Sequence, residues 1–497
     1  MIPTIKNSKW LPLCDVPVLD PSSWRQVIVQ NVREGDRIAA LFGCTHNASV
    51  PVRLYALLAR DGQGTLSVLC TDVEKDYPSL TPECPQAHWF EREIFEQWNI
   101  IPQGHQWLKP IRFHAPYASS TKTSPPIGEA DFFQLLGNEI HEVAVGPVHA
   151  GVIEPGHFRF QCHGEDVYHL EISLGYQHRA IEHSLIGGPN KRTLPYMETL
   201  AGDTTVGHTT AYCQLVESLA GCTVSSPLLR LRAIALECER LANHIGDLGA
   251  LAGDVGFLPT ASFCGRIRGD FLNLTAELCG SRLGRGFIRP GGVAFELDTS
   301  AFHGICERLT SVSHDARSAI DLLWNTASVV ARFENTGTLS QAAARDLGLV
   351  GLAARASGVK IDVRKDFPCG AYADEPFPVQ WGEKGDVYSR AYLRWLEILQ
   401  SIHFIIDKQE RFVPNAVQTQ IGNLQPSSLA VSLVEGWRGE ICHVGLTDDQ
   451  GKFAHYKIID PSFHNWFGLA MAMRNQLISD FPLCNKSFNL SYCGHDL

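Results

Sequence analysis

Length, composition and charge limit what this 497-residue chain can be. Hydrophobic residues make up 44% of it and charged residues 19%, which is typical of a globular protein with two or three domains. Its 42 lysines and arginines against 53 acidic residues give a net charge of -11, which argues against a nucleic-acid partner, because such a partner requires a clustered basic surface.

The first part of the chain, residues 1–113, reads as an α+β domain. Two apolar runs, 52–59 and 65–71, are joined by a glycine-containing loop, a pattern that predicts a β-hairpin. Residues 114–130 are rich in proline, serine and threonine and poor in apolar side chains, which predicts a linker. A second domain is therefore expected over residues 131–497.

Helical patterns dominate the second part. A strand is predicted at 158–163, before Gly164. The clearest helix begins at Ser226, a capping residue followed by the proline that suits a first helical position. Its apolar residues recur at steps of three and four and form one stripe, while Glu237, Arg240 and His244 share another face. Further elements are expected as follows: helices over 304–332 and 388–407, short strands from about 427, and a helix over 466–478.

The distribution of apolar residues bears on localisation. No run of eighteen apolar residues occurs, so no transmembrane helix is predicted. The first nine residues lack the apolar centre of a secretory signal, which indicates a cytoplasmic protein that can dock on a membrane subunit. The fifteen cysteines are too sparse for a disulfide framework and are expected to be mostly buried free thiols.

Cysteine spacing is more informative than cysteine number. The closest pairs, Cys213 with Cys222 and Cys484 with Cys493, are nine residues apart, so the chain contains no Cys-x-x-Cys. Iron–sulfur and structural zinc sites usually take ligands from such short spacings. No His-x-His or His-x-x-x-His pair occurs either. We therefore expect the chain to bind no metal or cluster by itself.

Short motifs follow one another in order between residues 146 and 440. They are Gly146-Pro-Val-His149, Glu154-Pro-Gly-His-Phe-Arg-Phe160, Gln177-His-Arg179, Leu236-Glu-Cys-Glu-Arg-Leu-Ala-Asn-His244, Ile288-Arg-Pro-Gly-Gly292, Arg355-Ala-Ser-Gly358, Asp362-Val-Arg364, Gly385-Asp386 and Glu435-Gly-Trp-Arg-Gly-Glu440. In this order they resemble the large subunit of energy-converting [NiFe] hydrogenases of the formate hydrogenlyase type. The resemblance implies a mostly helical large-subunit fold after residue 130.

The front part carries a second resemblance. Phe90-Glu-Arg-Glu-Ile-Phe-Glu96, Gly104-His105 and Pro110-Ile-Arg112 are similar to the small peripheral subunit of respiratory complex I that sits beside its quinone-site subunit. The chain thus looks like a fusion of modules similar to these paired peripheral-arm subunits of complex I. This implies an α+β domain over 1–113, a linker over 114–130 and a hydrogenase large-subunit-like domain over 131–497.

The sequence departs from the hydrogenase pattern at the metal ligands. Active relatives hold nickel and iron with four thiolates, which are the soft ligands that such a centre requires. In an alignment on His208 and Tyr212, the ligand positions hold other residues, and the [NiFe] centre is predicted to be absent. Cys493 lies one residue out of register and is expected to point elsewhere. The four lost ligand positions are Ala201, Thr204, Ser491 and Gly494.

The resemblance to the quinone-site subunit also has gaps. That subunit uses a histidine in the first motif and a tyrosine in the early ligand motif, and here Ile153 and Gly202 take those places. A quinone headgroup would lose its two best hydrogen-bond partners. The usual quinone pose is therefore not expected, while a different pose stays open.

The polar residues that remain at motif positions are candidates for a cavity or a proton-coupling route. Buried ionisable groups need partners, and their pKa values respond to a neighbouring charge, so such a set can relay protons. The alternative is structural: Arg355 with Asp362, and Glu237 with Arg240, would then be ion pairs that brace the fold. The resemblance implies no confident catalytic residue. The candidates are Glu154, His157, His178, Arg179, His208, Arg355, Asp362, Asp386, Glu435 and Arg438.

The resemblance implies a subunit of a membrane-associated, complex I-like oxidoreductase, peripheral on the cytoplasmic side of the membrane. Its expected partners are a small [4Fe-4S] subunit, a ferredoxin-like subunit and antiporter-like membrane subunits. Its role would be to couple electron transfer to proton or ion movement without hydrogen turnover. Two alternatives stay open: a quinone or small-substrate site in the emptied cavity, and a purely structural scaffold. No glycine-rich dinucleotide fingerprint follows a strand, so NADH would act through a partner.

Overall fold

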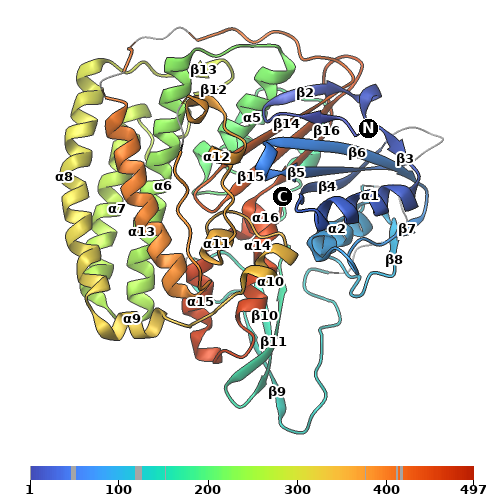
Figure 1. The fold of residues 1–497 in the computed structure, drawn as a ribbon, viewed down its shortest axis with the longest axis horizontal. Coiled ribbons are helices and arrows are strands. Elements are labelled where there is room, and N and C mark those ends of the chain that lie inside the picture. Colours follow the sequence, from blue (N-terminus) through green and yellow to red (C-terminus); the bar gives the residue numbers. More distant parts are fainter. Residues whose placement is uncertain are drawn as a thin grey trace.

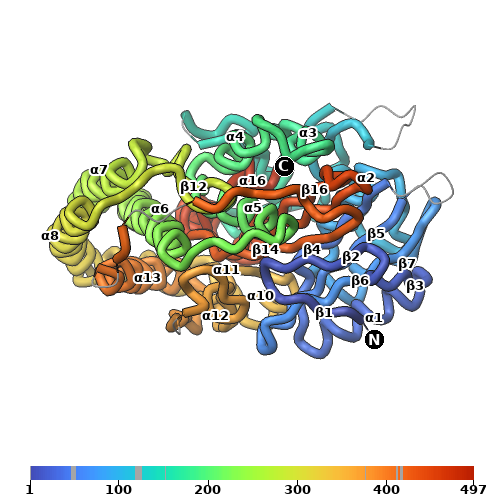
Figure 2. The backbone as a smooth tube through the Cα atoms, turned by 90° about the horizontal axis from the view of Figure 1, so that it is seen from above, coloured from blue at the N-terminus to red at the C-terminus, as the bar shows by residue number. Residues whose placement is uncertain are grey.

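The computed structural model describes residues 2–45, 52–117, 126–151, 153–374, 377–409, 412–414 and 418–497. Strands dominate the front of the chain and helices the rest, as the resemblance implies. Figure 1 shows the front sheet at one side and a bundle of long helices at the other, and Figure 2 shows the same division from above. The expected α+β domain followed by a mostly helical large-subunit fold is confirmed.

The front sheet has five strands. Its path runs β1-β6-β5-β4, with β3 pairing in parallel with β6. The predicted hairpin is confirmed as β5 and β6, which pair antiparallel from Val52–Val73 to Arg60–Thr65. The strands are β1 (Thr4–Ile5), β3 (Val18–Leu19), β4 (Arg37–Thr45), β5 (Val52–Arg60) and β6 (Thr65–Val73).

Two helices accompany this sheet, α1 (Pro21–Arg33) and α2 (His88–Trp98). α1 begins where it does because the Asp20 side chain accepts hydrogen bonds from the backbone N–H groups of Ser22 and Ser23, at 3.1 and 3.0 Å. A proline at the first helical position supports the same start. Beside them, β7 (Asp76–Pro78) and β8 (Ile101–Gln103) form a small parallel pair.

A second sheet joins the two ends of the chain. It has the order β16-β15-β14-β2, so the edge strand β2 (Lys9–Pro12) comes from the first part. β2 pairs antiparallel with β14, with Trp10 opposite Ala430. The other strands are β14 (Ser428–Glu435), β15 (Glu440–Thr447) and β16 (Phe453–Ile459), which confirms strands after residue 427.

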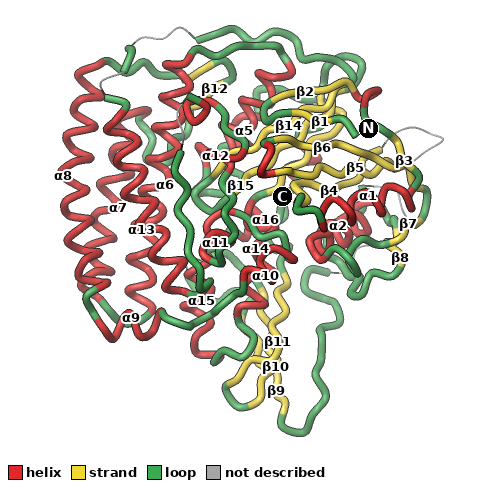
Figure 3. Tube along the Cα trace, viewed as in Figure 1, coloured by secondary structure: helices red, strands yellow, loops and turns green. Residues whose placement is uncertain are grey.

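A third sheet projects from the body of the molecule (Figure 3). It consists of β9 (Ile140–Val145), β10 (His157–His163) and β11 (Asp166–Ser173) in the order β11-β10-β9, and β10 contains the predicted strand at 158–163. A short two-stranded ribbon, β12 (Ile288–Arg289) with β13 (Gly292–Val293), lies elsewhere, at the end of the helix bundle.

The bundle consists of α6 (Ser226–Asp254), α7 (Leu258–Cys279), α8 (Thr299–Trp324) and α13 (Val387–Asp407). The helices predicted from Ser226 and over 388–407 are confirmed, and the apolar stripe of α6 is buried. A single helix over 304–332 is wrong. α8 ends at Trp324, and α9 (Ala327–Phe333) follows after Thr326, whose backbone is extended.

The last predicted helix is displaced. The sequence predicts it over 466–478, whereas α14 spans Pro461–Ala472, because the Asp460 carboxylate caps its first turn through the N–H of Ser462 at 2.8 Å. The remaining helices are α3 (Ile181–Ser184), α4 (Thr193–Met197), α5 (Thr205–Leu219), α10 (Gln341–Asp346), α11 (Gly351–Ala356), α12 (Val363–Asp366), α15 (Phe481–Phe488) and α16 (Tyr492–His495). Short 3-10 turns occur at Leu13–Asp15, Asp61–Gln63, Pro85–Ala87, Gly370–Ala373 and Ile478–Asp480.

The hydrophobic core runs continuously from the front sheet through the second sheet into the bundle. Most of the predicted linker, residues 118–125, lies outside the described residues. The division into 1–113 and 131–497 therefore stays a proposal about the sequence. Within the described ranges, no helix is both long and apolar enough to cross a membrane.

Candidate functional site

A cleft of about 430 Å³ lies where α6, α7 and α15 meet the loops before β10 and α5. A volume of this size is typical of small-molecule sites. It brings together residues that are far apart in the chain. Its lining consists of Ile153, Glu154, Gly202, Asp203, Asn243, Gly246, Asp247, Arg268, Arg438, Lys486, Asn489, Leu490, Ser491, Tyr492 and Cys493.

The four positions predicted to have lost the ligands lie in or beside this cleft, and the hydroxyl groups of Thr204 and Ser491 are engaged in hydrogen bonds. Thr204 Oγ1 accepts from Trp437 Nε1 and from Arg438 Nη1, both at 3.2 Å. Ser491 caps α16, because its Oγ accepts from the N–H of Gly494 at 2.9 Å. Ala201 is fully buried and offers no polar side-chain atom. These groups are hard oxygen atoms held by protein donors, unlike the soft thiolates of a nickel-iron site.

Gly494 shows that the fold here does not accommodate a thiolate. A Cβ atom at this position would lie 2.5 Å from Asp460 Cγ and 2.7 Å from Asp460 Oδ1. A cysteine side chain would therefore displace a buried carboxylate. Among the residues that the structure describes, no group of three or more His, Cys, Asp or Glu side chains could hold a metal ion. The residues present do not fit a [NiFe] centre.

The sequence predicts that Cys493 points away from the ligand positions, and in the structure its side chain lines the cleft. The helical turn of α16 carries Cys493 Sγ to within 2.8 Å of Glu154 Oε1, so the thiol donates to this carboxylate. Burial and the Glu154 charge raise the pKa of the Cys493 thiol to about 12. Cys493 is therefore a protonated thiol, and Glu154 is its acceptor.

Arg438 anchors the other wall of the cleft. It forms two hydrogen bonds with Asp203, at 2.6 and 2.8 Å, and its guanidinium lies over the Trp437 ring. Burial opposes ionisation of Asp203, but Arg438 outweighs this effect and lowers the pKa of Asp203. Ile153 and Gly202, which the sequence analysis places at the quinone-contact positions, line the same cleft.

Four buried polar side chains form a hydrogen-bonded series that begins at Asp460, the residue on which Gly494 packs. His208 Nε2 is 3.0 Å from Asp460 Oδ2, His208 Nδ1 is 3.1 Å from His443 Nε2, and His443 Nδ1 is 2.9 Å from the Tyr456 hydroxyl. A carboxylate only accepts, so His208 donates to Asp460, His443 donates to His208, and Tyr456 donates to His443. Burial, and then His208, lower the pKa of His443 well below its usual range. Each ring nitrogen of the two imidazoles thus has a hydrogen-bond partner.

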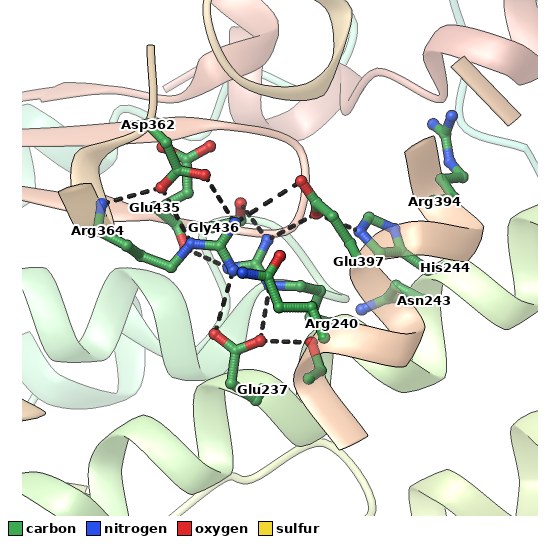
Figure 4. A network of polar contacts seen from close by, with 12 residues as sticks. Glu237, Arg240, Asn243, His244, Asp362, Arg364, Arg394, Glu397, Glu435 and Gly436 are labelled. Atoms are coloured by element: carbon green, nitrogen blue, oxygen red, sulfur yellow. Dashed lines mark hydrogen bonds and ion pairs between the residues drawn. The ribbon is translucent and has the colours of Figure 1, made fainter. Parts of the chain in front are cut away.

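A second polar cluster lies between α6, α12, α13 and the end of β14 (Figure 4). We call it the ion-pair network. Arg355 contacts Glu397 at 2.5 Å, Glu435 at 2.7 Å and Asp362 at 3.2 Å. Arg364 contacts Asp362 at 2.7 Å. None of these side chains is more than 2% exposed.

α6 supplies the other half of the ion-pair network. Arg240 contacts Glu237 at 3.1 Å and Glu397 at 3.5 Å, and His244 contacts Glu397 at 2.8 Å. Arg364 reaches Glu237 at 3.4 Å. The network therefore joins three arginines to four carboxylates, which leaves one carboxylate in excess.

One carboxylate of the network holds its proton more tightly than the others. Burial and then Asp362 raise the pKa of Glu435 to about 7, against the lowering effect of Arg355. By contrast, the pKa of Glu397 lies well below its usual range, because the surrounding cations, Arg355 first, outweigh its burial. Glu435 is thus the carboxylate of the network that takes up a proton most readily.

Comparisons with known proteins agree with this architecture. Residues 26–123 match the family "Respiratory-chain NADH dehydrogenase, 30 Kd subunit", and residues 254–425 match "Respiratory-chain NADH dehydrogenase, 49 Kd subunit". The carbon monoxide-induced hydrogenase of Rhodospirillum rubrum is 32% identical over 352 residues, which are 70% of this chain and 97% of that protein. The chain belongs to this family of hydrogenase and complex I large subunits.

Two further relatives match over most of their own length. Formate hydrogenlyase subunit 5 of Escherichia coli is 27% identical over 93% of this chain and 85% of its own. A subunit of the NADH-quinone oxidoreductase of Herpetosiphon aurantiacus is 29% identical over 72% of this chain and 98% of its own. Both resemblances predicted from the motifs are confirmed. The chain is a subunit of a complex I-like oxidoreductase and works with other subunits.

The structure distributes the candidate residues of this family member over several places. Glu154 and Arg438 line the cleft, His208 lies in the buried hydrogen-bonded series, and Arg355, Asp362 and Glu435 form the core of the ion-pair network.

Four candidates lie apart. Asp386 caps α13 through the N–H of Ser389, at 2.8 Å. His157 is half-buried on β10 beside the Phe132 ring, and His178 stacks on His114. Arg179 donates to the carbonyls of residues 199 and 200, just before the first lost ligand position.

Several site residues were missed from the sequence. His443 and Tyr456 lie on strands outside the quoted motifs, and Glu397 lies within α13, where it looks like an ordinary helical glutamate. Asp460 could have been found, since an aspartate before a proline and a helix is a capping signal. No local signal marks the other three.

Proposed function

We propose that this chain is the cleft-forming subunit of a membrane-associated, hydrogenase-related oxidoreductase and that it couples electron arrival at a partner's [4Fe-4S] cluster to proton or ion movement, without turning over hydrogen. One observation carries the proposal: oxygen groups and a glycine packed on Asp460 stand at the predicted ligand positions, and titratable groups surround them. The family supports the partners proposed here, namely the cluster-bearing small subunit, a ferredoxin-like subunit and antiporter-like membrane subunits, and it supports a peripheral location on the cytoplasmic side of the membrane.

The residues of this chain would act by holding and moving protons. An electron on a nearby cluster adds negative charge, which raises the proton affinity of groups in a low-dielectric interior. A proton taken up at His208 Nδ1 would require His443 to accept at Nε2 and to donate from Nδ1 to Tyr456. Asp460, 3.0 Å from His208 Nε2, would stabilise the resulting charge. The Glu435–Glu440 turn then connects this region to the ion-pair network, because it presents Arg438 to the cleft and Glu435 to Arg355.

A substitution of His208 tests the coupling. We expect His208→Gln, which keeps hydrogen-bonding groups but does not titrate, to leave assembly and electron transfer intact. The number of protons moved per electron should fall at least tenfold in the purified complex in vesicles. His303→Gln, on the exposed surface of α8, is the matched control. An unchanged proton-to-electron ratio in the His208 variant would refute the coupling role, and stoichiometric nickel in the complex would refute the missing centre.

A second candidate function is a quinone or small-substrate oxidoreductase site in the same cleft. Its volume of about 430 Å³ favours this, since a ligand of that size would contact Arg438 and the two lost quinone-contact positions. Tight binding of a quinone analogue that is lost in Arg438→Met would support this function. Absence of any such binding would leave the coupling role as the only proposal.

A further inference from the structure

A second cavity, of about 400 Å³, lies outside the cleft, and its wall includes β11, the strand that pairs with β10. We call it the junction pocket, because the front part and the second part of the chain both contribute to its wall. Its volume is close to that of the cleft, and the two cavities share no lining residue. The junction pocket is lined by Thr81, Pro82, Pro85, His88, Trp89, Arg92, Gln106, Trp107, Phe133, His169, Leu170, Glu171, Ile172, Phe467 and Ala470.

Aromatic rings dominate the wall of the junction pocket. The Trp107 and Phe133 rings meet edge to face with centroids 6.1 Å apart, and Phe133 lies 4.5 Å from the His169 ring. On another wall, His88 stacks on Phe467 at 5.3 Å. Trp107 remains 37% exposed, although it is large and apolar. Faces of this kind favour a flat ring as ligand.

Arg92 is the unusual member of this wall. The residue is only 7% exposed, and its guanidinium donates from Nε to the Lys109 carbonyl at 2.9 Å and from Nη2 to the Pro110 carbonyl at 2.7 Å. None of the carboxylates in the described ranges lies within ion-pair distance of it. A buried cation without a counter-ion is costly. Burial accordingly lowers the pKa of Arg92 to about 10.

The carboxylates nearby form no ion pair with Arg92, although the charge of Glu96 raises the pKa of Arg92 against the larger effect of burial. Glu171 lines the pocket but is paired with Lys109. The Glu96 oxygens accept from the backbone N–H groups of Arg112 and Phe113. Burial lowers the pKa of His88 to about 2 and that of His169 to about 4, so both rings are neutral at pH 7. The pocket therefore offers aromatic surface and one positive charge, Arg92, that forms no ion pair within the described ranges.

We propose that the junction pocket binds a planar aromatic molecule that carries one carboxylate. The ring would lie against the aromatic wall formed by Trp107, Phe133 and Phe467, and the carboxylate would pair with the Arg92 guanidinium. Arginine suits this role because its planar donor fork matches a carboxylate. This site is independent of the coupling proposed for the cleft.

Binding of two isosteric probes to the full-length chain tests both parts of the proposal. 2-Naphthoate carries the ring and the carboxylate, whereas 2-naphthamide carries the ring without the charge. We expect 2-naphthoate to bind one site per chain and to quench tryptophan fluorescence, with an affinity at least tenfold higher than that of 2-naphthamide. Equal affinities, or no binding of either compound, would overturn the proposal.

Variants assign the binding to this pocket. Trp107→Ala should weaken 2-naphthoate binding at least tenfold, while Trp381→Ala, which removes a similarly exposed tryptophan outside the pocket, should not change it. Arg92→Gln should bring the affinities of the two probes within about twofold of each other. If Arg92→Gln does not fold, the salt dependence of wild-type binding decides, because an ion pair weakens with salt. A Trp107→Ala variant with unchanged affinity would overturn the proposal.

Discussion

Arg355 illustrates how single residues of this protein carry charge into the core. Its side chain has no exposed surface, yet it contacts three carboxylates. Buried carboxylates can lie close together only if a cation and hydrogen bonds offset their mutual repulsion and their loss of hydration. The predicted pair of Arg355 with Asp362 therefore exists at 3.2 Å, but as part of a larger network rather than as an isolated brace.

The titration of Glu435 leads to a prediction about pH. Its pKa is raised to about 7 in the folded chain, against roughly 4.3 for an unfolded glutamate. The folded chain then holds a proton that the unfolded chain has released, so the stability that Glu435 contributes is present at low pH and is lost as the pH rises through about 7.

Glu435→Gln removes this titration and keeps an acceptor for Arg355. Relative to the variant, the wild type should lose on the order of 2 kcal/mol of unfolding free energy between pH 5 and pH 8. Chemical denaturation of both proteins at pH 5 and at pH 8 measures this change in unfolding free energy. Glu307→Gln, on the surface of α8, is the control. A difference between wild type and the Glu435 variant that does not change with pH would contradict the assignment.

At the scale of elements, the turn between β14 and β15 connects three regions. Glu435 contacts Arg355 in the ion-pair network, and Arg438 contacts Asp203 at the cleft. At its end, Glu440 pairs with Arg37 on β4 of the front sheet. This short segment thus links the front sheet, the cleft and the bundle through buried charges.

A double-mutant cycle tests the link to the front sheet. Arg37→Met should cost about 3–5 kcal/mol of unfolding free energy, because it leaves the Glu440 carboxylate buried without its cation. Adding Glu440→Gln should recover at least about 2 kcal/mol, which is the coupling between neighbours. Denaturant midpoints measure all four states.

The exposed pair Arg266 and Asp270 on α7 provides the comparison. Its cycle should give a coupling below about 1 kcal/mol. Equal couplings for the two pairs would show that burial of the Arg37–Glu440 pair has no energetic effect.

For the whole molecule, the two ends of the chain depend on each other. β2 forms the edge of the sheet that β14, β15 and β16 build near the other end. Asn7 strengthens this union, because its side chain donates to the carbonyls of Phe367 and Leu433 at 2.8 and 2.9 Å and accepts from the N–H of Leu433 at 2.8 Å. The front part therefore completes a sheet of the second part instead of standing beside it.

Removing the Asn7 side chain should loosen this sheet from its edge. In Asn7→Ala the backbone groups of Phe367 and Leu433 lose their partners, and the chain next to β2 loses its attachment to β14. We therefore expect the amides of β2 to exchange with solvent about tenfold faster. Exchange in β5 and β6 of the front sheet should not change. Lys6→Ala, at an exposed neighbouring position, is the control. Unchanged exchange in β2 would contradict the anchoring role of Asn7.

Local signals explain which elements could be predicted. α6 was found because a serine–proline start and an apolar stripe lie within one segment, and the β5–β6 hairpin because its strands are neighbours in the chain. The bounds of α14 were missed because they depend on a cap at Asp460. The contact of Cys493 with Glu154 could not be predicted, because it depends on the short helix α16 that turns the thiol toward this carboxylate.

The sequence by itself determined the family and the lack of closely spaced cysteine pairs, since motifs and spacings are properties of the covalent chain. Only the tertiary structure decided which charges meet. Glu397 and His244 are 153 positions apart, and Arg37 and Glu440 are 403 apart, yet each pair forms a contact in the core. Long-range packing creates these pairs, so no short stretch of sequence encodes them. The low dielectric of the interior then strengthens the interaction between their charges.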